Sequence, residues 1–473
     1  MSKIALIGAG SIIFATTLLN DMLGTECLQD STFALMGPTK WKLDKIETWA
    51  RGVIAKNKLG AKVSSTTDRR EALEGADYVL LLFQIGGLEA YRLDYEIPLK
   101  YGVDQCLGQC VGPGGVFRGN RSIPVLASIA KDMEELCPKA VILNYVNPMA
   151  ANCIGLGRSS QIKFVGLCHG VQTTLDLIAG YTNCKKSEID FLCAGINHMA
   201  WFLKIEKDGK DLYPLLKANS EKPQYYINDK VRIETMRHFG YFMTESTGHL
   251  SEYLPWFRKN KKALELYCDQ PAFGGETGAY YKYCVAIAKK FEKGDFIRLA
   301  GNDLEPRSKD YCSYVIEALE TGKLFQLNGN VMNTPGYIEN LPSDCCVEVP
   351  IFVDRNGLQP TFVGRLPTQL AALNMMDINV QLMASEAALE GDPEKLMMAC
   401  AMDPLTSAVL TLQETRSMVA EMLEAQRAWL PQFAGKSLRP LGNIATPKGT
   451  VGVAVPLDPA LAINNRFGKL ATA

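Results

Sequence analysis

The chain of 473 residues lacks long hydrophobic runs, an excess of charge of one sign and CxxC motifs. No apolar run reaches the roughly 18 residues that a membrane-spanning helix needs, so we expect no membrane contact. The net charge is −1, and electrostatics therefore favours neither nucleic acid nor an anionic surface as a partner. The 14 cysteines are scattered, which indicates free thiols and a cytoplasmic location.

Histidine is also scarce, with four in the chain, and one of them directly follows a cysteine in VGLCHGVQ. That pair is Cys168 and His169, and His198 follows in CAGINHMAWF. A lone buried cysteine is usually a small hydrophobic residue of the core. Spacing alone leaves a core role, a vicinal disulfide and an open metal site as alternatives. Two protein ligands would leave a metal accessible to a substrate, as catalysis requires.

The first 190 residues alternate between apolar, strand-like runs and helix-like stretches. The predicted strands are 3–10, 31–37, 61–68, 76–84, 140–148 and 162–168, and the first helices are 11–23, 39–58 and 69–75. Nearly continuous apolar runs are typical of strands that helices cover on both faces. The pattern predicts an α/β fold, with a Rossmann-like, doubly wound parallel sheet that binds ligands beyond the carboxyl ends of its strands.

A shortened dinucleotide fingerprint, GAGSII, ends the first strand. Gly8 allows a tight turn, and Gly10 lets a pyrophosphate approach the start of the following helix. Ile13 stands in place of the third glycine. We expect a nicotinamide dinucleotide to contact Gly8, Gly10, Ser11 and Ile12.

The end of the second strand leaves the choice of dinucleotide open. Gly37 stands where an acidic residue for the ribose is expected, and Lys40 and Lys42 follow. NAD is the predicted cofactor, with NADP as the alternative. Gln84 and Asn147 stand at the ends of two later strands, and we expect both to contact the cofactor.

Residues 102–124, GVDQCLGQCVGPGGVFRGNRSIP, are rich in glycine and predict a functional loop over the strand ends. In this loop Arg118, Asn120 and Arg121 could hold an oxyanion or a sugar hydroxyl. A plain linker with surface arginines is the alternative.

Residues 191–430 predict a second, mixed α+β domain for substrate, metal and oligomerisation. Its expected elements are a polar surface excursion at 207–224, two strands around the RNG turn in 347–364, and helices near 225–240, 275–295, 308–322, 367–390 and 403–430. Residues 431–473 predict an extension that is disordered or reaches a neighbouring subunit. We expect a homodimer or homotetramer.

Several motifs, in one order, resemble glycoside hydrolase family 4, especially its α-galactosidase/α-glucosidase branch. They are GPGGVFRGNRSIP, NYVNPMA, GLCHGVQ, AGINHMAWFL, GYFMTESTGHLSEYLPWF and LPSDCCVEVPIFVDRNGLQP, within a resemblance that covers residues 1 to about 430. The resemblance implies a retaining α-glycosidase that needs NAD and a divalent metal, usually manganese, and acts on a small α-glycoside.

The resemblance also implies an unusual mechanism. The nicotinamide takes a hydride from C3 of the sugar, and the resulting ketone acidifies the proton on C2. A base removes that proton, the glycosidic oxygen leaves by elimination, water adds and the hydride is returned. NAD-dependent glycosidases are exceptions to the rule of two catalytic carboxylates.

Particular residues match the family's motifs. Cys168 and His198 correspond to metal ligands, with sugar oxygens completing the shell. Asn147 corresponds to a residue that contacts the sugar, and we expect the same of Asn197. His169 stands where relatives carry the acid for the leaving group, although it could only orient the sugar.

The base that acts on C2 is less defined by the motifs. His249 and Tyr253 are the candidates. Glu252 is a third, although a solvated position on a helix surface is the more ordinary fate of a glutamate.

One motif departs from the family. The galactosidase branch commonly reads GDT and FRALR around GPGG, whereas this chain reads GQC and FRGNR. Gln109 thus replaces an aspartate and Cys110 a threonine, and Asn120 adds hydrogen-bond donors. Losing a carboxylate removes repulsion toward an anion, so we expect Gln109, Arg118 and Asn120 to bind an α-glucoside with an anionic C6 group, such as a sulfoquinovoside or a uronide. A neutral α-galactoside or α-glucoside is the alternative substrate. A sugar or hydroxy-acid dehydrogenase and an inactive cofactor sensor are the alternatives of other classes.

Overall fold

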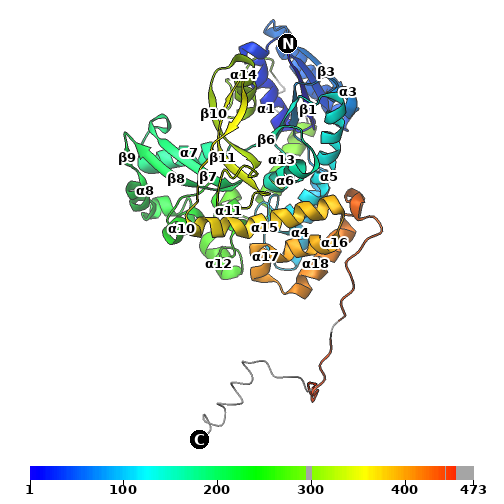
Figure 1. The fold of residues 1–473 in the computed structure, drawn as a ribbon, viewed down its shortest axis with the longest axis vertical. Coiled ribbons are helices and arrows are strands. Elements are labelled where there is room, and N and C mark those ends of the chain that lie inside the picture. Colours follow the sequence, from blue (N-terminus) through cyan, green and yellow to red (C-terminus); the bar gives the residue numbers. More distant parts are fainter. Residues whose placement is uncertain (294–300, 443, 454–473) are drawn as a thin grey trace. The chain divides into compact units, whose positions relative to one another are not determined.

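The computed structural model describes residues 1–293, 301–442 and 444–453. Its first six strands form a parallel sheet in the order β3-β2-β1-β4-β5-β6, of which β1, β3 and β6 are labelled in Figure 1. They are β1 (Lys3–Ile7), β2 (Thr32–Met36), β3 (Lys62–Thr66), β4 (Tyr78–Leu81), β5 (Val141–Asn144) and β6 (Phe164–Leu167). The predicted Rossmann-like sheet is confirmed.

The later strands extend the same sheet in antiparallel fashion, in the order β10-β11-β7-β8-β9 after β6. They are β7 (Asp190–Ile196), β8 (Met199–Lys207), β9 (Lys210–Asp211), β10 (Phe325–Met332), β11 (Cys346–Asp354) and β12 (Gly357–Pro360). β11 and β12 form the hairpin predicted around the RNG turn. The sheet therefore continues across residue 190, and a separate domain beyond that residue stays a prediction.

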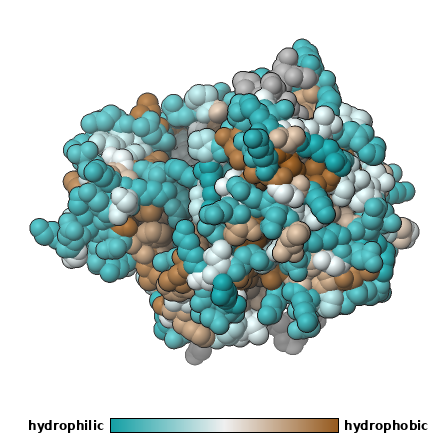
Figure 2. Space-filling model, turned by 90° about the horizontal axis from the view of Figure 1, so that it is seen from above, coloured by the Kyte–Doolittle hydropathy of each residue, from teal (hydrophilic) through white to brown (hydrophobic). Residues whose placement is uncertain are grey.

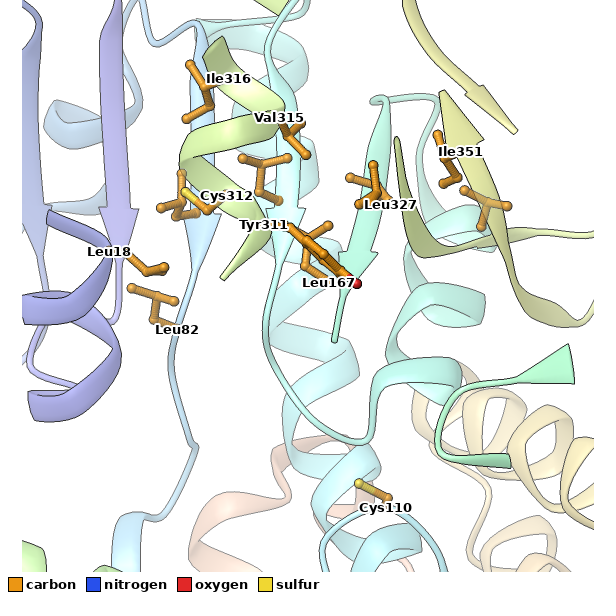
Figure 3. Close-up of a cluster of buried hydrophobic side chains, with 14 of the residues drawn as sticks. Leu18, Leu82, Cys110, Leu167, Tyr311, Cys312, Val315, Ile316, Leu327 and Ile351 are labelled. Carbon is orange, nitrogen blue, oxygen red and sulfur yellow. The ribbon is translucent and has the colours of Figure 1, made fainter. Parts of the chain in front are cut away.

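Helices cover both faces of the parallel strands. In β1, Ile4 and Leu6 belong to one hydrophobic cluster, and Ala5 and Ile7 belong to another. The first cluster includes residues of α1 (Ile12–Leu23), α2 (Lys40–Lys56) and α14 (Tyr311–Thr321); the second includes residues of α3 (Arg69–Leu73), α5 (Gly112–Leu136) and α6 (Met149–Ser159). Figure 3 shows Val315 and Ile316 of α14 among the buried side chains of the first cluster.

The remaining helices are α4 (Gly87–Lys100), α7 (Gly170–Thr182), α8 (Tyr213–Ser220), α9 (Pro223–Tyr226), α10 (Lys230–Phe239), α11 (Thr247–Tyr253), α12 (Lys261–Tyr267), α13 (Ala279–Glu292), α15 (Thr368–Glu390), α16 (Pro393–Met402), α17 (Pro404–Val409) and α18 (Leu412–Ala425). Of these helices, α10, α13, α15, α17 and α18 fall in predicted ranges, whereas the others were not predicted, and α8 lies in the stretch expected to be a polar surface excursion. The long helix α15 packs on α5, α6 and α16. Among the described helices, none is long and apolar enough to cross a membrane. The face in Figure 2 is largely hydrophilic, with small hydrophobic patches.

The predicted loop at 102–124 is wrong in its second half, because α5 begins at Gly112. The glycines there permit close packing instead of disrupting the helix. A Cβ on Gly114 would lie 2.6 Å from the Gly108 carbonyl oxygen, and one on Gly115 would lie 2.4 Å from the Cys110 carbonyl carbon. Tertiary packing thus outweighs the poor helix propensity of glycine.

The chain divides into two compact units, residues 1–438 and 439–473. Residues 431–438 thus belong to the first unit, and the role of the segment 431–473 stays a prediction. Phe433 is buried, and Gln432 donates a hydrogen bond to the Asn120 carbonyl at 2.6 Å. None of the described residues between 439 and 453 lies in a helix or strand.

Candidate active site

A cavity of about 620 Å³ lies at the carboxyl ends of β1, β2, β4 and β5. The lining includes seven of the predicted site residues: Gly8, Gly10, Ser11, Gln84, Gln109, Arg118 and Asn147. Ile12 is the first residue of α1. The sequence fingerprint and the residues at the later strand ends thus meet around one space, at the place where doubly wound sheets bind ligands.

The turn after β1 suits a dinucleotide phosphate. Gly8 has a φ of +92°, and a Cβ at this position would lie 2.7 Å from the Phe83 backbone nitrogen. The N–H groups of Gly8 and Ala9 donate to the Met36 carbonyl at 2.8 and 2.9 Å. Ser11 caps α1 without a side-chain hydrogen bond in the described structure. The first N–H groups of α1 are therefore left for a phosphate.

The adenosine end of this cavity carries no acidic residue among its lining residues. Gly37, Thr39 and Lys42 line the wall that follows β2. A lysine can pair with a 2′-phosphate, whereas a carboxylate would bind the ribose hydroxyl of NAD. NADP therefore stays open as the alternative cofactor.

Arg118 is the most constrained polar side chain of the cavity wall. Its Nη2 donates to Gln84 Oε1 at 3.1 Å, and its Nε donates to the Asn147 carbonyl at 3.2 Å. Its guanidinium lies 5.2 Å from the centre of the Tyr91 ring. Nη1 is buried and has no hydrogen-bond partner among the described residues. The N–H groups of Nη1 are therefore available to a hydroxyl or an anion.

Two neighbours of Arg118 were considered as ligand-binding residues, and both have partners inside the protein. Asn120 is fully buried and donates to the Val116 and Ala384 carbonyls at 2.9 and 3.3 Å. Arg121 is buried in an ion pair with Asp94. Because this segment is a helix, successive residues are about 100° apart and only part of α5 faces the cavity.

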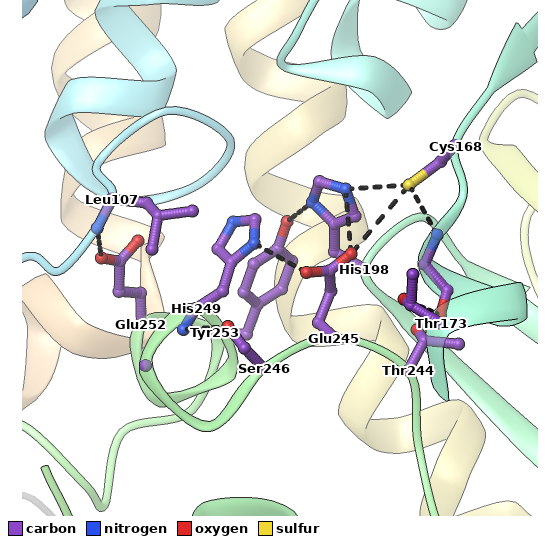
Figure 4. Close-up of polar contacts among 12 residues, drawn as sticks. Leu107, Cys168, Thr173, His198, Thr244, Glu245, Ser246, His249, Glu252 and Tyr253 are labelled. Atoms are coloured by element: carbon purple, nitrogen blue, oxygen red, sulfur yellow. Dashed lines mark hydrogen bonds and ion pairs between the residues drawn. The ribbon is translucent and has the colours of Figure 1, made fainter. Parts of the chain in front are cut away.

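A cluster of ionisable side chains lies where β6 and β7 end (Figure 4). Cys168 Sγ lies 3.3 Å from His198 Nε2 and 4.0 Å from Glu245 Oε1, and His198 Nε2 lies 3.4 Å from Glu245 Oε1. Metal bonds of about 2.3 Å to sulfur and about 2.1 Å to nitrogen place neighbouring ligand atoms about 3.1–3.6 Å apart. The two distances to His198 Nε2 fit one divalent cation, and the sulfur–oxygen distance of 4.0 Å would shorten slightly around it.

The backbone at two of these three residues is strained. His198 lies in the two-residue turn between β7 and β8 with a φ of 65°, and Glu245 has a φ of 79°. A residue other than glycine in this region costs on the order of 1 kcal/mol or more, and such strain concentrates at functional sites. The side chains of Cys168 and Glu245 are only partly buried, so a ligand can approach them.

The surroundings of Cys168 and Glu245 shift the pKa values of the two groups in opposite directions. Burial, and then the charge of Glu245, raise the pKa of the Cys168 thiol well above its ordinary value. Burial alone would raise the pKa of Glu245, but His198 and His249 outweigh it and hold that pKa below its usual range. A divalent cation would favour the thiolate as well as the carboxylate.

Two further predicted residues support the cluster from α11. The Tyr253 hydroxyl lies 3.3 Å from His198 Nδ1, which leaves Nε2 facing Cys168. His249 Nδ1 lies 3.3 Å from Glu245 Oε2. Burial raises the pKa of the Tyr253 phenol well above its ordinary value. Tyr253 is therefore suited to orienting His198, and His249 is better suited to moving a proton.

Glu252 does not have the solvated position that we expected. It is fully buried, and its carboxylate accepts the backbone N–H groups of Leu107 and Gly108. These bonds fix the loop before α5. They also occupy the carboxylate, so Glu252 is not favoured as the base.

The structure does not bring His169 into the cluster. Its side chain is half exposed, and its Nδ1 lies 3.7 Å from Asp310 Oδ1. The hydrogen bond to Asp310 raises the pKa of His169. A protonated imidazole at this position could donate a proton to a leaving group, so the predicted role stays open. Asn197 lies beside Cys168 and the buried Glu348.

Two residues of the site were not predicted, Glu245 and Cys110. Glu245 stands four positions before His249, a spacing that could have indicated a shared site. Cys110 was noted only as a replacement for threonine. Its sulfur and one nitrogen each of His198 and His249 lie within 4.8 Å of one another. Because Gln109 lines the cavity, the cavity and the cluster are adjacent at residues 109 and 110.

The sequence matches models of known families over most of its length. The family 4 glycosyl hydrolase model matches residues 3–183, and the model of the family 4 glycosyl hydrolase C-terminal domain matches residues 193–406. The chain belongs to glycoside hydrolase family 4. The predicted family is thereby confirmed, and the protein is a glycoside hydrolase.

Relatives within family 4 cover nearly the whole chain. An α-galactosidase from Rhizobium meliloti (strain 1021) is 42% identical over 440 residues, which span 91% of this chain and 90% of that protein. An α-galactosidase from Bacillus subtilis (strain 168) is 42% identical over 441 residues, which span 92% of this chain and all of that protein. A solved 6-phospho-α-glucosidase from gut microorganisms, in complex with NAD and Mn²⁺, shares the fold with a TM-score of 0.72, 20% identity and coverage of 91% of this chain and 99% of that one.

Proposed function

We propose that this family 4 enzyme is an α-galactosidase that uses NAD and a divalent cation, Mn²⁺ above all. The observation that carries the proposal is the convergence of Cys168, His198 and Glu245 beside a cavity with a dinucleotide turn. Two relatives named α-galactosidases, each 42% identical, support the choice of sugar. A related structure that holds NAD and Mn²⁺ supports the choice of cofactors.

The predicted anionic substrate is not supported. That prediction rested on Gln109, Arg118 and Asn120, and Asn120 is bonded to helix carbonyls in the interior. The relatives reported above are named for a neutral sugar. Gln109 and Arg118 do line the cavity, and their amide and guanidinium donors serve neutral hydroxyls equally well.

The chain's own residues divide the work of the proposed reaction. When bound, NAD would accept and return a hydride, and the cation would polarise neighbouring sugar oxygens. Cys168, His198 and Glu245 would hold the cation, with Tyr253 fixing the ring of His198. His249 would remove the C2 proton through its Nε2, since Nδ1 faces Glu245. Against the effect of burial, Cys110 and Glu245 raise the pKa of His249, so the ring must lose a proton before it can act as this base.

His169 and Asp310 would act on the leaving group. The carboxylate keeps the imidazole protonated, and the half-exposed ring can meet the aglycone oxygen from the solvent side. Protonation of that oxygen lowers the barrier to elimination.

Turnover of four nitrophenyl α-glycosides tests the substrate. We expect the galactoside to be hydrolysed faster than the glucoside, the glucuronide and the sulfoquinovoside when NAD and Mn²⁺ are present. A faster sulfoquinovoside would reject the neutral substrate. Incorporation of solvent deuterium at C2 without lasting NADH supports the glycosidase, whereas accumulation of NADH would indicate a dehydrogenase.

Cofactor choice and assembly have tests of their own. Titration with NAD and with NADP, followed by protein fluorescence, measures the preference that Gly37 and Lys42 leave open. The predicted homodimer or homotetramer is measured by sedimentation. The cytoplasmic location stays a prediction.

A further inference from the structure

A second set of metal-binding atoms lies on the other side of His198. It consists of the Cys110 sulfur and one nitrogen each of His198 and His249, all within 4.8 Å of one another. All three residues are buried, and His249 is 1% exposed. The His198 and His249 rings lie 4.5 Å apart between centres. Cys110 has no role in the reaction proposed above, whereas His198 and His249 each have one.

One atom of this set points to a missing ligand. His249 Nε2 is buried, and the Cys110 sulfur is the one group among the described residues that is placed to bond it. A thiol is a weak hydrogen-bond partner, so this buried nitrogen is satisfied better by a metal ion than by the sulfur alone. The Nδ1 atom of the same ring is held by Glu245 at 3.3 Å, so the ring presents Nε2 in a fixed direction. A metal-bound histidine commonly has its other nitrogen held in this way.

We infer that Cys110, His198 and His249 form a second cation site, which binds Zn²⁺ in preference to Mn²⁺. One thiolate and two imidazoles are soft to intermediate ligands, which select zinc. The first set contains the Glu245 carboxylate and is partly exposed, which suits an oxygen-preferring ion and an incoming sugar. Binding would release to solvent the protons that Cys110 and the two imidazoles hold at the ligand atoms, as the zinc–sulfur and zinc–nitrogen bonds form.

The two sites exclude one another because they share His198. A neutral imidazole has one lone pair for a metal, so it cannot serve two ions at once. Zinc in the second site would withdraw His198 from Cys168 and Glu245 and would occupy Nε2 of His249. Zinc would therefore inhibit the enzyme by drawing away a ligand, and a chelator would reverse the inhibition.

Cobalt spectroscopy of the whole chain tests the second site without relying on activity. Co²⁺ bound to a thiolate gives a charge-transfer band, and Cys168→Ser removes the thiolate of the first site. We expect Cys168→Ser to keep a cobalt–thiolate band that Zn²⁺ abolishes and Mn²⁺ does not. Cys168→Ser combined with Cys110→Ser should lack the band. A folded Cys168→Ser protein without a band would overturn the inference.

Crystals of the unaltered enzyme soaked in Zn²⁺ decide the matter if the variants fail to fold. We expect anomalous scattering between Cys110 and His249. A zinc peak only between Cys168 and Glu245 would reject the second site. Cys106→Ser is the matched control, because Cys106 is a buried neighbour in the same loop and bonds the Ala272 carbonyl instead of a histidine. It should bind zinc as the unaltered enzyme does.

Discussion

The cavity at the strand ends, where we propose that the dinucleotide binds, and the ionisable cluster are adjacent but are built in different ways. The cavity turn consists of glycines and backbone N–H groups supplied within one short segment, with Gly8 at its tightest point. The cluster consists of side chains from distant segments, Cys168, His198 and Glu245, two of them on strained backbone. A phosphate needs close approach to the backbone, whereas a cation needs convergent charges. Changes in the first region should therefore affect binding, and changes in the second should affect turnover.

Removing the cluster's sulfur should have the largest effect. We expect Cys168→Ser to lower kcat at least about a thousandfold, because a cation that stabilises charge in the transition state loses a ligand. Affinity for NAD should be unchanged. Steady-state kinetics and cofactor titration measure the two effects. Cys184→Ser, a change at a partly exposed thiol, is the control and should retain activity. Full activity of Cys168→Ser would remove the thiolate from the site.

Two neighbouring arginines should separate binding from stability. Arg121→Met leaves the buried Asp94 without its cation and should destabilise the fold by about 3–5 kcal/mol. Arg118→Met should leave the melting temperature nearly unchanged but weaken cofactor or sugar binding, because Arg118 lines the cavity. The melting temperatures and KM values of the two variants measure the difference between them. Equal destabilisation by both changes would contradict the division of roles.

The pH dependence of stability should reveal the buried carboxyl behind the cluster. Burial, and then the charge of Glu245, raise the pKa of Glu348 to about 8. The unfolded chain therefore binds fewer protons than the folded chain between about pH 4.5 and about pH 8, and stability falls as pH rises through this window. Without metal, the free energy of unfolding of Glu348→Gln should fall between about pH 5 and about pH 8 by about 3 kcal/mol less than that of the unaltered protein. Parallel curves would exclude the raised pKa.

The smallest effect is expected at the cavity turn. Gly8→Ala places a Cβ against the Phe83 backbone at a φ of +92°. We expect this change to lower the free energy of unfolding by about 1–3 kcal/mol and to weaken cofactor binding. Gly180→Ala is the matched control, because the space around Gly180 in α7 is open. That change should stabilise the helix by up to about 1 kcal/mol. Unaltered NAD binding in Gly8→Ala would show that the turn does not hold the cofactor.

Most of the sheet could be predicted from the sequence because its strands are buried on both faces. Such strands read as continuous apolar runs, and the alternation with helices gave the order of elements. The start of α5 could not be predicted, since Gly114 and Gly115 have low helix propensity and only the contacts with Gly108 and Cys110 make the helix favourable. The antiparallel extension of the sheet also depends on contacts between distant segments.

The site residues also differ in how far the sequence alone could predict them. Gly8 and Gly10 carry a local signal, and Cys168 and His198 were found through resemblance to the family. Glu245 was missed because its position depends on a strained loop that no periodicity marks. The buried position of Asn120 was not foreseen because it follows from the phase of a helix that the sequence did not reveal.

The central claim is that Cys168 and His198 hold one divalent cation next to the dinucleotide cavity. Anomalous scattering from crystals grown with Mn²⁺ and NAD measures this directly. We predict a manganese peak within bonding distance of Cys168 Sγ and His198 Nε2, beside a nicotinamide in the cavity lined by Asn147. A manganese peak elsewhere, or a dinucleotide bound away from this cavity, would contradict the account.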